Sequence, residues 1–137
     1  MSTLQVTNIQ DTAGANSLTT AQLYSGAAKA WVNFNGTGTV STNQTIRASF
    51  NVSSVFKNAT GDYKINFTNS FVDANYCVVL GNDTNGGTTT NTTGHATIAR
   101  SAYVNYVYSA SAINLLFGSS AAAGLADTNV ICVSVFR

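Results

Sequence analysis

Alternation of apolar and polar residues is the main pattern of the chain from Lys29 onward. Tyr63, Ile65 and Phe67 alternate with polar residues over 62–68, and this period of two predicts a strand with one buried face. A longer alternation over 46–57 predicts a second strand, joined to the first by a turn at 58–61. We expect one face of the longer strand to carry Ile46, Ala48, Phe50, Val52, Ser54 and Phe56, and the other Arg47, Ser49, Asn51, Ser53, Val55 and Lys57.

Shorter apolar runs predict the remaining strands. They lie at 31–34, 76–80, 97–99, 103–108, 113–117 and 127–136. The first is followed by a glycine-rich turn at 35–38, where glycine supplies the positive φ that a tight turn needs. About seven or eight short strands with short connections predict an all-β domain, and we expect an antiparallel β-sandwich over 29–137.

Residues 1–28 lack this alternation and have too few apolar side chains to bury a core of their own. We therefore expect an extended N-terminal segment that docks on another surface. Ser17 is a candidate N-cap for a short helix that runs through Tyr24 and is ended by Gly26. The apolar residues of the segment are Leu4, Val6, Ile9, Leu18 and Leu23.

Two predicted strands, 76–80 and 130–136, are apolar on both faces. In a two-layer domain of this size only one face of a sheet meets the core, so the second face needs another cover. A partner subunit is the simplest cover, and the first segment folding back is the alternative. The candidates for an oligomer interface are Ile131, Val133 and Val135.

Composition and charge exclude several classes of protein. Of the 137 residues, 49 are Thr, Asn or Ser, only 8% are charged, and Glu and Pro are absent, which argues against a helical bundle. A net charge of +1 disfavours nucleic acid as a partner. No apolar run reaches the roughly 18 to 20 residues of a membrane-spanning helix, and Met1 leads into polar residues rather than a signal peptide. We expect no membrane insertion and a start in the cytosol.

Candidate catalytic groups are few. Asp62, Asp73, Asp83 and Asp127 lie at turns or before a strand, where Asp is favoured for local backbone bonding rather than for a pair of catalytic carboxylates. No Ser lies in the strand–turn–helix signature of a nucleophile that could work with His95. We expect no enzymatic activity and no cofactor.

The cysteines and the single histidine do not form a metal-binding pattern. Neither Cys77 nor Cys132 lies at a zinc-ligand spacing from His95, so we expect no metal within one chain. The alternative is that three copies of His95, which meet on the symmetry axis of an oligomer, bind a metal ion or an anion. Each cysteine lies in an apolar strand, and we expect two buried free thiols rather than a disulfide.

The polar tract 82–94 and a group of tyrosines form the candidate binding surface. Sugars are commonly bound by flat aromatic faces together with short amide, hydroxyl and carboxylate groups. The alternatives are a solvent-facing linker for the tract and core packing for the tyrosines. The candidates for contact with a receptor or glycan are Asp83, Asn85, Asn91, His95, Tyr103, Tyr106 and Tyr108.

Several stretches resemble the terminal domain of bacteriophage tail fibre and tail-tip proteins. They are AKAWVNFNGTG at 28–38, IRASFNVSSV at 46–55, TGDYKINF at 60–67, DANY at 73–76 and VSVFR at 133–137. The opening, STLQV at 2–6 with IQD at 9–11, resembles the start of short phage fibre proteins. The resemblance covers most of 2–80 and the final strand, and it implies a trimeric, β-rich virion appendage that touches the host cell.

A second resemblance is to H-type lectin domains, which are six-stranded sandwiches that form trimers and bind sugars. It rests on Tyr63-x-Ile65-x-Phe67, Phe71 and Tyr76-x-Val78.

These expectations combine into a non-catalytic phage tail-fibre or tail-tip protein. We expect a homotrimer, assembled in the host cytoplasm and carried on the virion, that attaches to a host surface glycan or protein. Residues 1–28 would contact other virion proteins, and residues 29–137 would form the head. The alternatives are a purely structural virion protein, such as a head fibre or capsid decoration, and a lectin-like or hydrolytic domain that acts on surface glycan.

Overall fold

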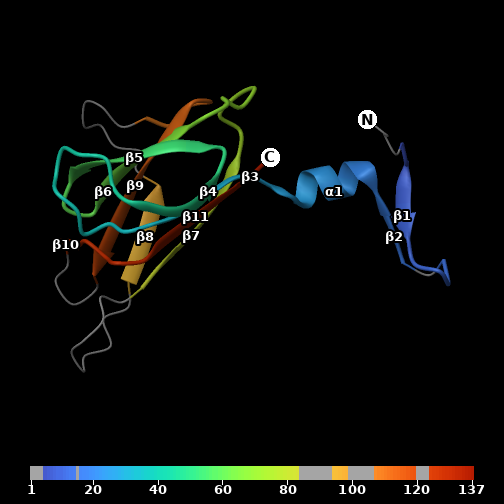
Figure 1. Cartoon of the computed structure of the whole chain (residues 1–137), viewed down its shortest axis with the longest axis horizontal. Helices are drawn as coiled ribbons and strands as arrows, with labels where there is room; N and C mark the ends of the chain where they lie inside the picture. The colour runs from blue at the N-terminus through green and yellow to red at the C-terminus, as the bar shows by residue number, and fades with distance from the viewer. Residues whose placement is uncertain (1–4, 15, 84–93, 99–106, 120–123) are drawn as a thin grey trace.

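The computed structural model describes residues 5–14, 16–83, 94–98, 107–119 and 124–137, with 94–98 described by their backbone. These ranges form one short helix and a series of antiparallel strands (Figure 1). The elements are β1 Asn8–Gln10, β2 Ser17–Thr19, α1 Thr20–Gly26, β3 Ala28–Phe34, β4 Ile46–Phe50, β5 Val52–Ala59, β6 Asp62–Phe67, β7 Cys77–Asn82, β8 Gly94–Ile98, β9 Ala112–Ser119, β10 Gly124–Leu125 and β11 Ile131–Phe136.

Two antiparallel sheets pack face to face and confirm the predicted all-β sandwich. One sheet has the order β4-β3-β11-β7, and the other has the order β10-β9-β6-β5, with β8 also paired to β9. The hairpin predicted at 58–61 joins β5 to β6, and Gly61 at its turn has a φ of +65°, a conformation that glycine adopts without strain. We call residues 28–137 the sandwich head.

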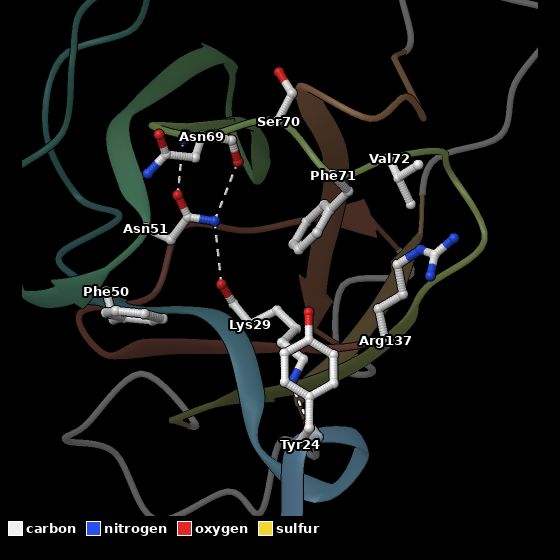
Figure 2. A pocket seen from close by; sticks show the side chains of 9 residues that line it. All are labelled: Tyr24, Lys29, Phe50, Asn51, Asn69, Ser70, Phe71, Val72 and Arg137. Atoms are coloured by element: carbon white, nitrogen blue, oxygen red, sulfur yellow. Dashed lines mark hydrogen bonds between the residues drawn. The ribbon is translucent and has the colours of Figure 1, made fainter. Parts of the chain in front are cut away.

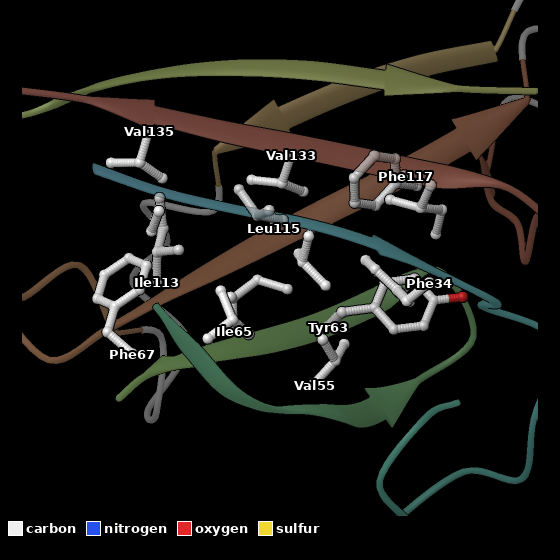
Figure 3. Close-up of a cluster of buried hydrophobic side chains, with 14 of the residues drawn as sticks. Phe34, Val55, Tyr63, Ile65, Phe67, Ile113, Leu115, Phe117, Val133 and Val135 are labelled. Carbon is white, nitrogen blue, oxygen red and sulfur yellow. The ribbon is translucent and has the colours of Figure 1, made fainter. Parts of the chain in front are cut away.

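Buried side chains from both sheets meet between them (Figure 3). The ring of Tyr63 lies edge-on to Phe34 and Phe117, with centroid distances of 5.2 and 5.9 Å. The inward residues of β6 are those that the alternation predicts: Tyr63 and Ile65 are fully buried, and Phe67 is 7% exposed. All residues of the described core lie between Ala30 and Val135.

The three residues expected at an oligomer interface belong to this core instead. Ile131, Val133 and Val135 are 0, 2 and 1% exposed within a single chain, so the prediction that they contact a partner is wrong. Their strand lies in the middle of its sheet, and its inner face packs on β5, β6 and β9 of the opposite sheet (Figure 3).

The long strand predicted over 46–57 is broken at Asn51. This residue has a φ of +55°, and the chain passes there from β4 in one sheet to β5 in the other. Phe50, directly before the break, is 56% exposed, and a register shift in β5 between Val52 and Ser54 turns Val55 and Lys57 inward, where they are 0 and 2% exposed. The predicted faces are therefore wrong for all three of these side chains.

Residues 5–26 form an N-terminal arm that projects from the sandwich head (Figure 1). It consists of the β1–β2 hairpin and α1, and its described residues are exposed. The predicted short helix is present, but its cap is Thr19 rather than Ser17, which lies in β2. The Thr19 hydroxyl accepts from Gln22 N, while Gln22 Oε1 accepts from Thr19 N; this reciprocal pair is a capping box.

The outward side of the four-stranded sheet carries apolar side chains and both cysteines. Trp31 and Val79 are 39 and 56% exposed, and Cys77 and Cys132 are free and exposed. The expected free thiols are confirmed. Their expected burial is wrong, because the inward positions are occupied by Val and Leu in β7 and by Ile and Val in β11. We call the surface formed by Trp31, Cys77, Val79 and Cys132 the outer sheet face. The N-terminal arm of the same chain does not cover it.

Candidate functional site

Most of the predicted binding residues fall outside the part of the chain that the structure describes. This holds for Asn85, Asn91, Tyr103 and Tyr106. His95 lies in β8 opposite Gly118 of β9, and its side chain is also outside the description. The role of the polar tract 82–94 in binding therefore remains a prediction.

Asp83 and Tyr108, the two described candidates, have structural contacts. Asp83 extends the pairing of β7 with β11, because its N–H donates to Val130 O at 3.0 Å and its Oδ1 accepts from Val130 N at 3.2 Å. The Tyr108 ring stacks on Tyr76 with a centroid distance of 4.8 Å, and its hydroxyl donates to Tyr76 O at 2.8 Å. Tyr108 therefore packs against the core, which is the alternative that the sequence left open for the tyrosines.

A pocket lies where the N-terminal arm meets the sandwich head (Figure 2), and we call it the neck pocket. Its volume is about 320 Å³. It is formed by the end of α1, the start of β3, the β4–β5 junction, the segment 69–72 and the residue after β11. The lining residues are Tyr24, Lys29, Phe50, Asn51, Asn69, Ser70, Phe71, Val72 and Arg137.

Asn51 fixes the wall of the neck pocket. Its Nδ2 donates to Lys29 O and to Asn69 O, both at 3.1 Å, and its Oδ1 accepts from Asn69 N at 2.7 Å (Figure 2). One side chain thus ties β3 and the segment 69–72 to the junction of the two sheets. Asparagine suits this position because it tolerates a positive φ better than other residues with a side chain.

Two cations of the neck pocket have partners. The Lys29 Nζ lies 3.4 Å from the centroid of the Tyr24 ring and donates to the Tyr24 carbonyl oxygen. Arg137 forms a bidentate pair with Asp73, with Nε–Oδ1 and Nη2–Oδ2 distances of 3.1 and 2.5 Å. The bond from Arg137 and the N–H of Asn75 lower the pKa of Asp73 below its ordinary value.

Sequence reasoning does not find the neck pocket. Phe50 is expected on the buried face of a strand, and Asn51 is expected in its middle. Asn69, Ser70 and Arg137 come from a connection and from the end of the described chain, and no local pattern marks them. Asn51 directly follows an aromatic residue, but so does Asn35, and this feature therefore does not mark the pocket.

An ion pair between buried Lys57 and partly exposed Asp127 lies elsewhere, between the ends of the two sheets. Lys57 Nζ is 2.6 Å from Asp127 Oδ2 and also donates to Gly36 O and Gly38 O. Asp127 Oδ1 accepts from Gly61 N and from the Tyr63 hydroxyl. Burial opposes ionisation of Asp127, but these donors together hold the pKa of its carboxyl below its ordinary value. Burial and the contact with Asp127 raise the pKa of Tyr63.

This ion pair is a structural connection. The ammonium of Lys57 has three oxygen partners, the side chain is only 2% exposed, and buried charges of this kind are retained when they are fully bonded. It joins the loop after β3, the β5–β6 hairpin and the segment before β11.

The described residues contain neither a candidate metal centre nor a helix that could span a membrane. No group of three or more His, Cys, Asp or Glu side chains there could hold a metal ion, and no helix there has the length and apolar character to cross a membrane.

No protein-family model, curated protein or solved structure matches the chain.

Proposed function

We propose that this chain is a non-catalytic attachment protein of a phage virion, part of a tail fibre or tail tip. Several copies assemble through the N-terminal arm, and the sandwich heads meet the host cell surface. The observation that carries the proposal is the division of the chain into a head whose described residues form a hydrophobic core and an arm whose described residues are all exposed.

The exposed apolar residues of the arm favour assembly. Val6, Ile9, Leu18 and Leu23 are 44, 51, 41 and 48% exposed in the single chain. A short segment whose described residues are all exposed gains little from folding alone. Several exposed apolar side chains on one short segment are typical of a surface that another protein covers.

The outer sheet face provides a second surface for contact between copies. Trp31 and Val79 lie on β3 and β7, at the same level of the sheet, with Ser134 between them. Cys77 and Cys132 lie beside them and are exposed. The Arg47 guanidinium lies at the margin of this face, where it donates to Asn33, the residue that donates to Cys132 Sγ, so contact over Trp31 and Val79 buries mainly apolar surface. We propose a homotrimer, the assembly that the resemblance to phage fibre proteins implies.

Attachment by such an assembly needs no chemistry and no high affinity at one site. When several heads bind the same cell, the avidity exceeds the affinity of one head by about a hundredfold or more. A chain in which only 8% of the residues are charged also limits unspecific electrostatic binding.

The test compares the full chain with a variant that starts at Ala27. We expect native mass spectrometry to show trimers of the full chain and monomers of the variant, while both give the same melting transition of the head. Labelled full-length protein should bind cells of at least one strain in a panel of bacteria, and the variant should bind the same cells at least about a hundredfold more weakly.

Two results would overturn the proposal. If the full chain is a monomer, the arm does not assemble copies of this protein. If it assembles but binds no cell in the panel, and instead binds purified virions, the structural alternative of a head fibre or capsid decoration replaces the attachment role.

A further inference from the structure

We infer that the neck pocket binds one neutral sugar ring of a cell-surface polysaccharide. This inference rests on the proposed attachment function and gives it a site and a ligand class. It places the contact at Phe50, Asn69 and Arg137, away from the polar tract 82–94.

The size and exposure of the neck pocket fit a single ring. A volume of about 320 Å³ lies at the lower end of small-molecule sites. Phe50, Tyr24 and Val72 are 56, 69 and 82% exposed, so apolar surface is open to a ligand at the rim. An exposed aromatic ring can pack on the apolar face of a pyranose.

Polar groups that can bond sugar hydroxyls lie beside this apolar surface. Arg137 uses two of its five N–H donors, one on Nε and one on Nη2, for Asp73. Three donors remain, and the two on Nη1 have no acceptor within the described residues. The Asn69 side-chain amide and the Ser70 hydroxyl line the same pocket. A guanidinium, an amide and a hydroxyl together offer both donors and acceptors, as the paired hydroxyls of a sugar require.

The charges favour a neutral sugar over an acidic one. The charge of Arg137 is balanced by Asp73, and the ammonium of Lys29 is directed to the ring and carbonyl of Tyr24. An acidic sugar would therefore have to compete with partners that are already in place.

The walls are held in position before a ligand arrives. Three hydrogen bonds of Asn51 fix the backbone at Lys29 and Asn69, and the bidentate pair fixes Arg137 against Asp73. A preformed site loses less conformational entropy on binding than a mobile one.

The test uses ¹⁵N-labelled full-length protein and methyl glycosides of glucose, mannose, galactose and glucuronic acid. We expect at least one neutral glycoside to shift the amide signals of Lys29, Asn51 and Asn69 with a Kd of about 1–10 mM. Phe50→Ala should weaken this binding roughly tenfold. Asn69→Ala should weaken it by about three- to tenfold, and the Asn69 side chain is bonded to no described residue, so this substitution removes no bond within the described fold.

Val40→Ala is the matched control, because Val40 is an exposed apolar residue at 42% that does not line the neck pocket. It should bind as the natural chain does. Melting curves and native masses of all variants establish that fold and assembly are retained, and Asn69→Ala keeps the test valid if Phe50→Ala alters assembly.

The inference is wrong if no neutral glycoside shifts these signals at about 50 mM, if the glucuronide alone binds, or if both pocket variants bind like Val40→Ala. Cell binding that survives both variants likewise refutes the pocket while leaving the attachment function standing. Sugar binding in the pocket of a protein that binds no cell would instead refute the attachment function.

Discussion

Asn51 is the single residue that separates two strands of different sheets. Its φ of +55° costs most side chains about 1–2 kcal/mol relative to a right-handed conformation, and its side chain makes three hydrogen bonds to the backbone. The residue therefore determines both the turn of the chain and the position of the neck pocket wall.

Substitution of Asn51 should separate these two roles. Asn51→Gly loses the three hydrogen bonds but tolerates the positive φ, and we expect it to lower the free energy of unfolding by about 1–2 kcal/mol. Asn51→Ala also acquires the backbone strain, and we expect a loss about 1 kcal/mol larger. Urea unfolding measures both values, and equal losses would contradict a role for the backbone conformation.

Lys57 shows how far a single residue can depart from its expected position. The alternation places it on a polar, solvent-facing side, yet it is 2% exposed and bonded to Asp127. Its partner is 70 residues away in the sequence, and no local pattern reveals a charge so distant. The register shift in β5 between Val52 and Ser54 precedes Lys57 and turns it to the inner face.

The ion pair predicts a pH dependence of stability. The carboxyl of Asp127 has its pKa lowered below the ordinary 3.8 in the folded protein, so its contribution is complete above that pH and is lost as the pH falls through the lower, folded pKa. At pH 7, Asp127→Asn leaves the buried Lys57 charge without its carboxylate, and we expect a loss of about 3–5 kcal/mol.

The difference between the natural chain and Asp127→Asn should shrink as the pH falls below 3.8. Chemical unfolding at a series of pH values between about 2 and 7 measures this difference. A difference that stays constant across that interval would show that the carboxylate charge is not responsible.

At the scale of elements, local alternation predicts the hairpin of β5 and β6 but not the break before it. The inward face of β6 is predicted because Tyr63, Ile65 and Phe67 pack on a core that any sandwich provides. The break at Asn51 is missed because polar and apolar residues continue to alternate across it, and a shift by one residue exchanges the two faces of a strand. The neck pocket depends on this break, so the sequence pattern does not reveal the pocket.

The helix α1 should depend on its capping box. A helix of seven residues is marginal in water, and it has no buried residue to stabilise it. We expect Thr19→Ala to destabilise the helix by about 1 kcal/mol, so hydrogen exchange at the amides of residues 23–27 becomes several times faster in the full chain. The melting temperature of the sandwich head should stay the same, and a lowered melting temperature would mean that arm and head unfold together.

At the scale of the whole molecule, the chain combines a stable head with an arm and a sheet face that stay exposed in one copy. The head is self-contained because its described core lies within residues 30–135. The sequence predicts that apolar surface remains to be covered, but it assigns the wrong residues. Alternation cannot tell which of two apolar faces of β11 turns inward, since that depends on the opposite sheet.

The two exposed thiols report on whether the outer sheet face is covered. Phe136 is the register partner of Cys77 and Gly81 that of Cys132, so the cysteines lie four positions apart along β11, or about 13 Å, too far for a disulfide within one chain. We expect two thiols per chain to react rapidly with a thiol reagent in the variant that starts at Ala27, and slowly in the assembled full chain. Equal rates would place the contact between copies elsewhere.

The central place of β11 affects how the nascent chain folds. β3 and β7 lie on either side of it, and about 50 to 100 residues separate each from this strand along the polypeptide. Until β11 leaves the ribosome, both strands have an unpaired edge towards the gap, and such edges are prone to pair with other chains. Slow synthesis of the segment before β11 would prolong that vulnerable stage, so the yield of soluble protein depends on how quickly the middle strand arrives.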